Sequence, residues 1–274
     1  MLKEITIGKY YPAQSVIHKL DPRVKLAGTI LYVISLFPYS TAEVYLIASL
    51  YLAVMLKISR IPVRYMLKGL KPVIILIAFT AIFNLFLTPG MDIVFSVGSL
   101  HITRSGIKKA VFMVLRLIYL IMGSSLLTYT TTPNQLTDGI EKALRPLNKV
   151  KIPVHEFALM MSLALRFIPI LMEEAEKITK AQSARGADFE EGGFIKKAGN
   201  IISIIVPLLV SATRRAGDLA LAMDARCYHG GSNRTKLKPL KYSLRDFVGY
   251  FIVIFYFVII IVAGHYCIVP FNFS

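Results

Sequence analysis

The sequence contains two matching segments, each of which ends in an Ala-Arg pair. Residues 175–186 align without gaps to residues 216–227, and the two segments share three Ala positions and the Arg. Residues three or four apart lie on one face of a helix. The spacing therefore predicts two helices, each with an Ala-rich face and with a guanidinium group at its far end, at Arg185 and Arg226.

Guanidinium chemistry allows two interpretations of these residues. An Arg near the end of a helix interacts favourably with the helix dipole and the last carbonyl groups. Gly186 and Gly230-Gly231 would end the two helices. A guanidinium group also forms bidentate hydrogen bonds with carboxylates and tolerates burial better than Lys. The dipole would explain a single Arg, but two copies in one register favour a pair of helix ends that dock into grooves of a soluble partner.

Residues that could support catalysis do not form a complete site. His155-Glu156 matches half of a helical zinc-protease motif, but Leu159 occupies the position of the second His. No Walker motif is present, and no Ser-His-Asp, Cys-His or phosphate-binding Gly-rich pattern stands out. Cys227 and Cys267 lie far apart, without neighbouring residues at metal-ligand spacing. The sequence therefore predicts a non-catalytic protein with no metal site and no cofactor of its own.

The composition indicates a membrane protein. Of the 274 residues, 55% are hydrophobic and only 18% are charged, the mean hydropathy is +0.60, and the apolar residues form long blocks. A soluble protein of this size needs a more polar surface. The formal net charge of +16 could attract nucleic acid, but no stretch interleaves basic and aromatic residues on a polar face. Lys and Arg in cytoplasmic loops explain the charge, so we expect a lipid bilayer and no nucleic acid as a partner.

The apolar blocks predict five membrane-spanning helices, since a span needs about 20 mostly apolar residues. The first block, Val24 to Leu56, is too long for one span, and Pro38-Tyr39-Ser40 divides it into two. The other three spans are expected at 72–88, 107–129 and 247–269. A short extended piece is expected at Val94–Gly98, between the third and fourth spans.

Basic loops predict the orientation of these spans. Residues 1–25 and 57–71 are rich in Lys and Arg, which places the N-terminus in the cytoplasm and the C-terminus outside. Arg104, Lys108 and Lys109 break this rule at the outer end of the fourth span. Glu43 is the only acid inside the predicted spans before residue 130, which argues against an ion-coupled transporter.

Arg116 lies inside the fourth predicted span. An Arg within a membrane is a candidate functional residue. The interpretation that we favour is structural, with the side chain facing the helix bundle and bonded to a carbonyl or polar group.

Three parts of the chain follow from this pattern. Residues 1–130 hold spans one to four, residues 131–246 form a cytoplasmic segment with the two Ala-Arg ends, and residues 247–274 hold the last span. The middle part contains two stretches, starting at Phe157 and Ile201, that are apolar first and charged later. Both are too short or too charged for clean spans, and they predict long helices on the inner membrane face.

Four motifs carry a resemblance to a known family. They are Leu20-Asp21-Pro22-Arg23-Val24-Lys25-Leu26, Thr131-Thr132-Pro133, Leu163-Ala164-Leu165-Arg166-Phe167-Ile168-Pro169 and Ala181-Gln182-Ser183-Ala184-Arg185-Gly186-Ala187-Asp188. The sequence resembles the transmembrane (T) components of energy-coupling factor transporters over nearly the whole chain. The second Ala-Arg copy departs from the family pattern, because Cys227 replaces Gly.

The resemblance implies an all-α integral membrane protein with about five spans and a cytoplasmic coupling domain of long helices. It also implies that Arg185 and Arg226, with their flanks Ala184, Gly186, Ala225 and Cys227, dock into two ABC-type ATPase subunits. ATP would be bound by those partners, and a separate membrane S component would bind a vitamin or another micronutrient. The expected location is the bacterial cell membrane.

An alternative function is that of a conventional ABC permease with its own substrate path. Such permeases dock through one short Glu-Ala-Ala…Gly loop. Glu174-Ala175-Glu176 matches that pattern poorly, and no Gly follows at suitable spacing. The two long helices therefore favour the scaffold function over the permease.

Overall fold

The computed structural model describes residues 10–87, 93–97, 100–150, 153–187, 193–230 and 239–268. Lys3, Lys9, Asp188 and Gly231, which contributed to the sequence interpretation, lie outside these residues. The chain divides into two compact units, of which one comprises residues 8–139 and 240–274, and the other comprises residues 1–7 and 140–239. The boundaries of the three parts predicted from the sequence remain a prediction.

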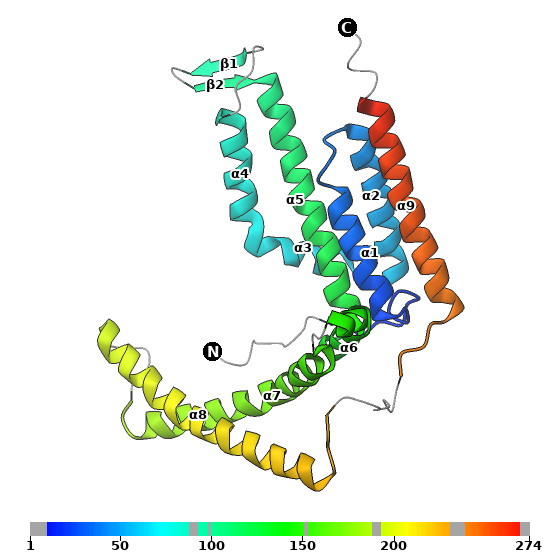
Figure 1. Cartoon of the computed structure of the whole chain (residues 1–274). Helices are drawn as coiled ribbons and strands as arrows, with labels where there is room; N and C mark the ends of the chain where they lie inside the picture. Colours follow the sequence, from blue (N-terminus) through cyan, green and yellow to red (C-terminus); the bar gives the residue numbers. More distant parts are fainter. Residues whose placement is uncertain are drawn as a thin grey trace. The chain divides into compact units, whose positions relative to one another are not determined.

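The first unit, called the bundle unit below, is mainly helical (Figure 1). Its helices are α1 (Pro22–Ser35), α2 (Ala42–Ser59), α3 (Val63–Leu70), α4 (Ile74–Leu87), α5 (Arg104–Thr130), most of α6 (Pro133–Leu144) and α9 (Leu244–Ile268). A 3-10 turn with Pro72 at its centre joins α3 to α4. The antiparallel strands β1 (Ile93–Val97) and β2 (Leu100–Thr103) lie between α4 and α5. Strand β1 confirms the expected extended piece from Val94 to Val97, and Gly98 lies outside the described residues.

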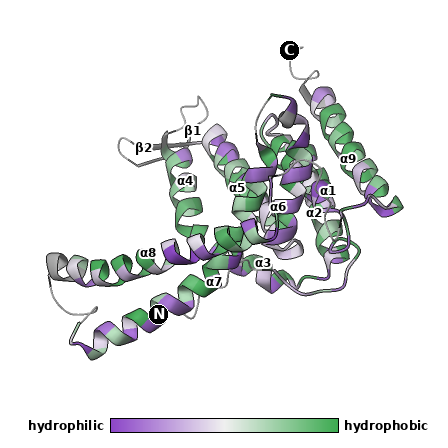
Figure 2. Ribbon diagram, turned by 60° about the horizontal axis from the view of Figure 1, so that its bottom comes forward, coloured by the Kyte–Doolittle hydropathy of each residue, from purple (hydrophilic) through white to green (hydrophobic). Residues whose placement is uncertain are grey.

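The second unit, called the crossing unit below, contains two long helices. They are α7 (Val154–Ala184) and α8 (Phe194–Ala225), and a 3-10 segment (Arg145–Val150) precedes them. Pro169 lies inside α7 and Pro207 inside α8. In Figure 2, most of α4 and α9 is green, the colour of hydrophobic residues, whereas α7 and α8 show both hydrophobic (green) and hydrophilic (purple) residues.

The helix starts follow local capping chemistry. Thr132 and Gln135 form a reciprocal capping box at α6, in which each side chain accepts the backbone N–H of the other, at 3.2 and 3.3 Å. Thr103 caps α5 by accepting the N–H of Gly106. At α1, Asp21 is the N-cap and Pro22 occupies the first turn, where its missing N–H costs no hydrogen bond.

Five helical segments in the described part of the chain are long and apolar enough to cross a membrane. They are Ala42–Ser59, Val63–Phe86, Arg104–Thr130, Val154–Ala184 and Leu244–Tyr266. Four of them coincide with predicted spans, and the prediction of an all-α membrane protein with about five spans is confirmed. The set differs at two helices, because α1 has only 14 residues and spans about 21 Å, whereas α7 qualifies by its apolar first half.

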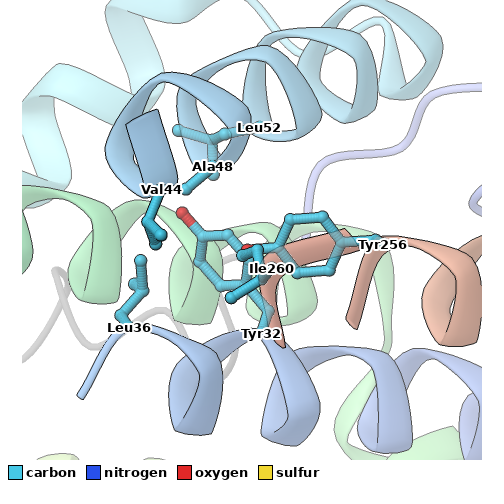
Figure 3. Packing of buried hydrophobic residues seen from close by; sticks show 7 residues of the cluster. All are labelled: Tyr32, Leu36, Val44, Ala48, Leu52, Tyr256 and Ile260. Atoms are coloured by element: carbon cyan, nitrogen blue, oxygen red, sulfur yellow. The ribbon is translucent and has the colours of Figure 1, made fainter. Parts of the chain in front are cut away.

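The core of the bundle unit lies between α1, α2 and α9 (Figure 3). It consists of Tyr32, Leu36, Val44, Ala48, Leu52, Tyr256 and Ile260. The ring centroids of Tyr51 and Tyr256 lie 4.0 Å apart, in a stacked arrangement. Close approach of α5 to α1 depends on Gly123, because a Cβ atom there would lie 2.5 Å from the ring of Tyr32.

Buried polar groups tie the start of α1 to the start of α9. The carboxylate of Asp246 accepts the N–H of Asp21 at 2.8 Å, the N–H of Ser243 at 2.7 Å and the hydroxyl of Ser243 at 2.9 Å. The Lys25 ammonium donates to the carbonyls of His18, at 3.1 Å, and Thr130, at 2.8 Å. Asp246 is only 2% exposed, so these hydrogen bonds form a buried lock between three chain segments.

Arg116 ties the turn between α1 and α2 to α5. Its guanidinium donates to the hydroxyl of Tyr45 at 3.0 Å, the carbonyl of Tyr39 at 3.1 Å and the hydroxyl of Ser40 at 3.1 Å. All three partners are neutral, and two of them belong to the turn. This geometry agrees with the structural interpretation of Arg116.

Candidate functional site: two equivalent helix ends

The end of α7 is a compact hydrogen-bonded cap built on Arg185. Arg185 is the last residue before the chain turns, and Gly186 follows with a φ of 89°. The N–H of Gly186 donates to the carbonyl of Ser183, and the N–H of Ala187 donates to that of Gln182, both at 3.0 Å. This pair of bonds is the Schellman motif, in which a left-handed residue lets the backbone satisfy its own last carbonyls.

The end of α8 repeats this cap bond for bond. Arg226 takes the position of Arg185, and Cys227 adopts the left-handed conformation with a φ of 57°. The N–H of Cys227 donates to the carbonyl of Asp224 at 2.9 Å, and the N–H of Tyr228 donates to that of Met223 at 3.0 Å. The two segments that match in sequence therefore also match in backbone geometry.

Both caps leave their Arg side chains at the protein surface. All six predicted site residues are exposed: Ala184, Arg185, Gly186, Ala225, Arg226 and Cys227. Backbone N–H groups already bond the carbonyls at C2 and C3 of each helix. Within the described ranges, neither guanidinium forms an ion pair or bonds these carbonyls. Helix capping by the Arg side chain therefore does not account for either residue.

The left-handed conformation predicts opposite effects of two substitutions. A side chain with a Cβ atom costs roughly 1–2 kcal/mol in this region, whereas Gly adopts it freely. We expect Cys227→Gly to stabilise the α8 cap by about 1 kcal/mol, and Gly186→Ala to destabilise the α7 cap similarly. Hydrogen–deuterium exchange should show the Tyr228 amide about fivefold slower in the first variant, and the Ala187 amide about fivefold faster in the second.

Gly217→Ala is the matched control for these substitutions. Gly217 lies inside α8 and a Cβ atom there would meet nothing within 4 Å, so Ala should stabilise the helix by about 0.5–1 kcal/mol. Unchanged exchange at Tyr228 in the Cys227→Gly variant would show that Cys227 adopts its conformation without cost.

An ion pair joins the two helices at equivalent points of the repeat. Glu174 precedes the first matching segment and Arg215 precedes the second, and their charged groups are 2.5 Å apart. The Gln182 amide also donates to the carbonyl of Ser203 at 3.2 Å. Because α7 and α8 run in opposite directions from the Glu174–Arg215 contact (Figure 1), Arg185 and Arg226 lie on opposite sides of it.

The two Arg residues are equidistant from this contact along their helices. Each lies eleven residues beyond its member of the Glu174–Arg215 pair, which is about 16 Å at 1.5 Å per residue. The helices thus relate to each other as the two halves of an approximate twofold arrangement. The sequence analysis did not predict this ion pair, although Glu174 and Arg215 occupy equivalent positions in the alignment of the two segments.

A hollow of about 420 Å³ lies beside the second helix end. Its lining includes Leu159 and Leu163 of α7 and Met223, Arg226 and Tyr228 from the α8 end. Arg226 therefore stands at the edge of a concavity whose lining mixes apolar side chains with polar groups. Such a surface suits a docked side chain better than a flat one does.

His155, the half-match to a metal-protease motif, has a structural contact. Its Nδ1 lies 3.0 Å from a carboxylate oxygen of Glu141. This contact joins the start of α7 to α6 within the crossing unit. His155 is therefore part of the packing of this unit.

Comparisons with known proteins agree with the family motifs. Residues 13–237 match the CbiQ family, which is described as "Cobalt transport protein". The chain is 50% identical over 249 residues to the "Energy-coupling factor transporter transmembrane protein EcfT" of Clostridium kluyveri, covering 90% of this chain and 92% of that protein. It is 44% identical over 246 residues to the protein of the same name from Bacillus subtilis, covering 90% and 93% of the two chains.

Proposed function

This chain belongs to the CbiQ/EcfT family and is the transmembrane subunit of an energy-coupling factor transporter. We propose that Arg185 and Arg226 dock this subunit onto two ABC-type ATPase subunits. The observation that carries the proposal is the equivalence of the two helix caps, which share the Ala-Arg pair, the hydrogen-bond pattern and the left-handed residue after the Arg. Two equivalent caps suit two equivalent grooves. An exposed guanidinium group supplies the bidentate, charge-assisted bonds that such a groove would recognise.

The arrangement of the crossing unit supports two partners instead of one. The caps lie on opposite sides of the Glu174–Arg215 contact, so the backbones at Arg185 and Arg226 are separated by up to roughly 33 Å along the helices. A single groove of ordinary size does not reach both. Affinity purification of the tagged chain tests this proposal, because it should recover two ABC-type ATPase chains.

In the proposed transport cycle, each subunit has a separate role. The partners bind and hydrolyse ATP, and their movement shifts the two caps relative to each other. The long helices transmit that shift to an S component, a separate membrane protein that binds a vitamin or another micronutrient. The chain itself is a transporter subunit without a catalytic role, and its relatives favour this function over that of a conventional ABC permease.

The orientation of the chain predicts different labelling of its two cysteines. If the N-terminus is cytoplasmic, Cys227 faces the cytoplasm and Cys267 lies at the outer end of α9. In intact cells, a membrane-impermeant maleimide should label Cys267 and should reach Cys227 only after permeabilisation. The variants Cys227→Ser and Cys267→Ser assign each signal to one thiol, and the reverse pattern would overturn this orientation.

A further inference from the structure

An apolar crevice opens in the bundle unit where α9 begins. Its volume is about 200 Å³, and α1, α2, α5 and α9 all contribute to its walls. Leu20, Val24, Tyr51, Leu52, Leu126 and Val253 are among the lining residues. Nearly the whole surface of the crevice is hydrocarbon, so it is suited to an alkyl chain and not to a polar solute.

The crevice opens at the surface of the bundle unit. Val54 and Ile58 of α2 and Val248 and Ile252 of α9 line it and are 40–56% exposed. Along α9 the lining extends from Arg245 to Val253, which is about 12 Å of helix. The hydrocarbon core of a bilayer is about 30 Å thick, so a crevice of this length fits within one leaflet.

A second, polar hollow adjoins the crevice. Its volume is about 780 Å³, and its basic side chains are Lys19, Lys241 and Arg245. Arg245 and Leu20 line both the hollow and the crevice. Arg245 therefore stands where the polar hollow meets the apolar crevice.

The charge of the polar hollow is positive. Its two acids already have partners, since Asp21 pairs with Arg23 at 2.9 Å and Asp246 accepts three hydrogen bonds in the buried lock. Burial lowers the pKa of His18 below its ordinary value of 6.5, so this ring is neutral at pH 7. Lys19, Lys241 and Arg245 are exposed and form no ion pair within the described residues.

We propose that these two hollows form a binding site for one anionic phospholipid. One acyl chain occupies the crevice, and the phosphate group binds Arg245 with Lys19 and Lys241 beside it. A guanidinium group binds phosphate through two parallel hydrogen bonds. A negatively charged headgroup directly joined to an alkyl chain matches a basic hollow that is continuous with an apolar crevice.

The bound lipid would reinforce the lock between α1 and α9. Its headgroup contacts the segment before α1 and the start of α9, which are the two segments that Asp246 joins. Its acyl chain fills space between α2 and α9 that side chains leave open. The site is thus expected to act on the stability of the bundle unit, independently of the proposed role of Arg185 and Arg226.

The absence of Trp from the chain allows a direct test. Ile252→Trp places a single reporter at the mouth of the crevice. The full chain is reconstituted in vesicles containing either brominated phosphatidylglycerol or brominated phosphatidylcholine, whose bromine atoms quench Trp on contact. We expect half-maximal quenching at an at least fivefold lower mole fraction of the anionic lipid, since each basic residue near a headgroup favours anionic lipid by about this factor.

Two variants separate a specific site from general surface charge. Combined replacement of Lys19, Lys241 and Arg245 by Ala should remove the preference, whereas combined replacement of Lys57, Arg64 and Lys68 by Ala should preserve it. Ile75→Trp in the otherwise unchanged chain is the second reporter, because Ile75 of α4 is 80% exposed, and it should be quenched equally by both lipids.

Three outcomes would overturn the proposal. They are equal quenching of the Ile252→Trp reporter by both lipids, a preference that survives loss of the three basic residues of the hollow, and an equal preference at the Ile75→Trp reporter. The first comparison uses the chain with all its basic residues, so it decides the question even where the triple variant does not fold.

Discussion

Replacing both Arg185 and Arg226 by Glu is expected to abolish association with the ATPase subunits and, with it, transport. The substitution removes two exposed guanidinium groups and places a negative charge at each helix end. Losing one partner of a hydrogen-bonded charge pair at an interface costs roughly 2–5 kcal/mol, so two such losses should weaken binding by more than about a thousandfold. Affinity purification of the tagged chain and uptake assays in cells measure the two consequences.

Single substitutions and a matched control sharpen this experiment. Arg185→Ala and Arg226→Ala should each weaken association without removing it, because the other cap remains. Lys177→Glu combined with Arg214→Glu makes the same charge change on exposed residues of the same two helices and should leave association intact. Recovery of both ATPases and normal transport by the double Glu variant would refute the docking role of the caps.

Asp246→Ala should destabilise the bundle unit by about 3 kcal/mol. The substitution leaves the buried N–H group of Asp21 and the part-buried N–H group of Ser243 without their acceptor, and a buried donor without a partner costs about 1–3 kcal/mol. It also removes the negative charge that lies near the buried ammonium of Lys25. Unfolding of the purified chain by SDS, followed by loss of helical circular dichroism, should show the midpoint shifted to lower detergent fraction.

Asp246→Asn separates the two contributions to this effect. Asn keeps an acceptor oxygen for one N–H group but carries no charge, so we expect about half of the loss. Asp218→Ala is the control for loss of an acid, because Asp218 is exposed on α8. Equal stability of the Asp246→Ala variant and the unchanged chain would show that the lock contributes nothing net.

The sequence predicted those features that repeat within one helix or fill one span. The match between residues 175–186 and 216–227 predicted helix ends at Arg185 and Arg226, because the cap geometry depends on neighbours within six residues. The expectation that Gly230-Gly231 ends the second helix was wrong, since α8 ends at Ala225 and Cys227 takes the left-handed position. Four of the five spans followed from apolar length alone. The substitution of Cys227 for Gly was visible in the sequence, but only the structure shows that it adopts the same left-handed conformation.

Contacts between distant segments could not be predicted in the same way. Asp21 and Asp246 are 225 residues apart, and nothing in either local pattern selects the other as its partner. Ser243 and Asp246 have the spacing of a capping box, which could have indicated the start of α9. The short length of α1 was also hidden, because apolar residues continue through Leu36 and Phe37 after the helix has ended.

The Glu174–Arg215 contact divides each of α7 and α8 into a short arm that ends at the Arg and a long arm that ends at the start of the helix. From that pivot each helix reaches eleven residues to its Arg, but α7 extends 20 residues back to Val154 and α8 extends 21 back to Phe194. If the two helices rotate as rigid rods about this contact, their N-terminal ends move about twice as far as their Arg ends. A small closure of the ATPase grooves would thus become a large displacement at the opposite ends, and Pro169 and Pro207, both on the long arms, set how much of it bending absorbs.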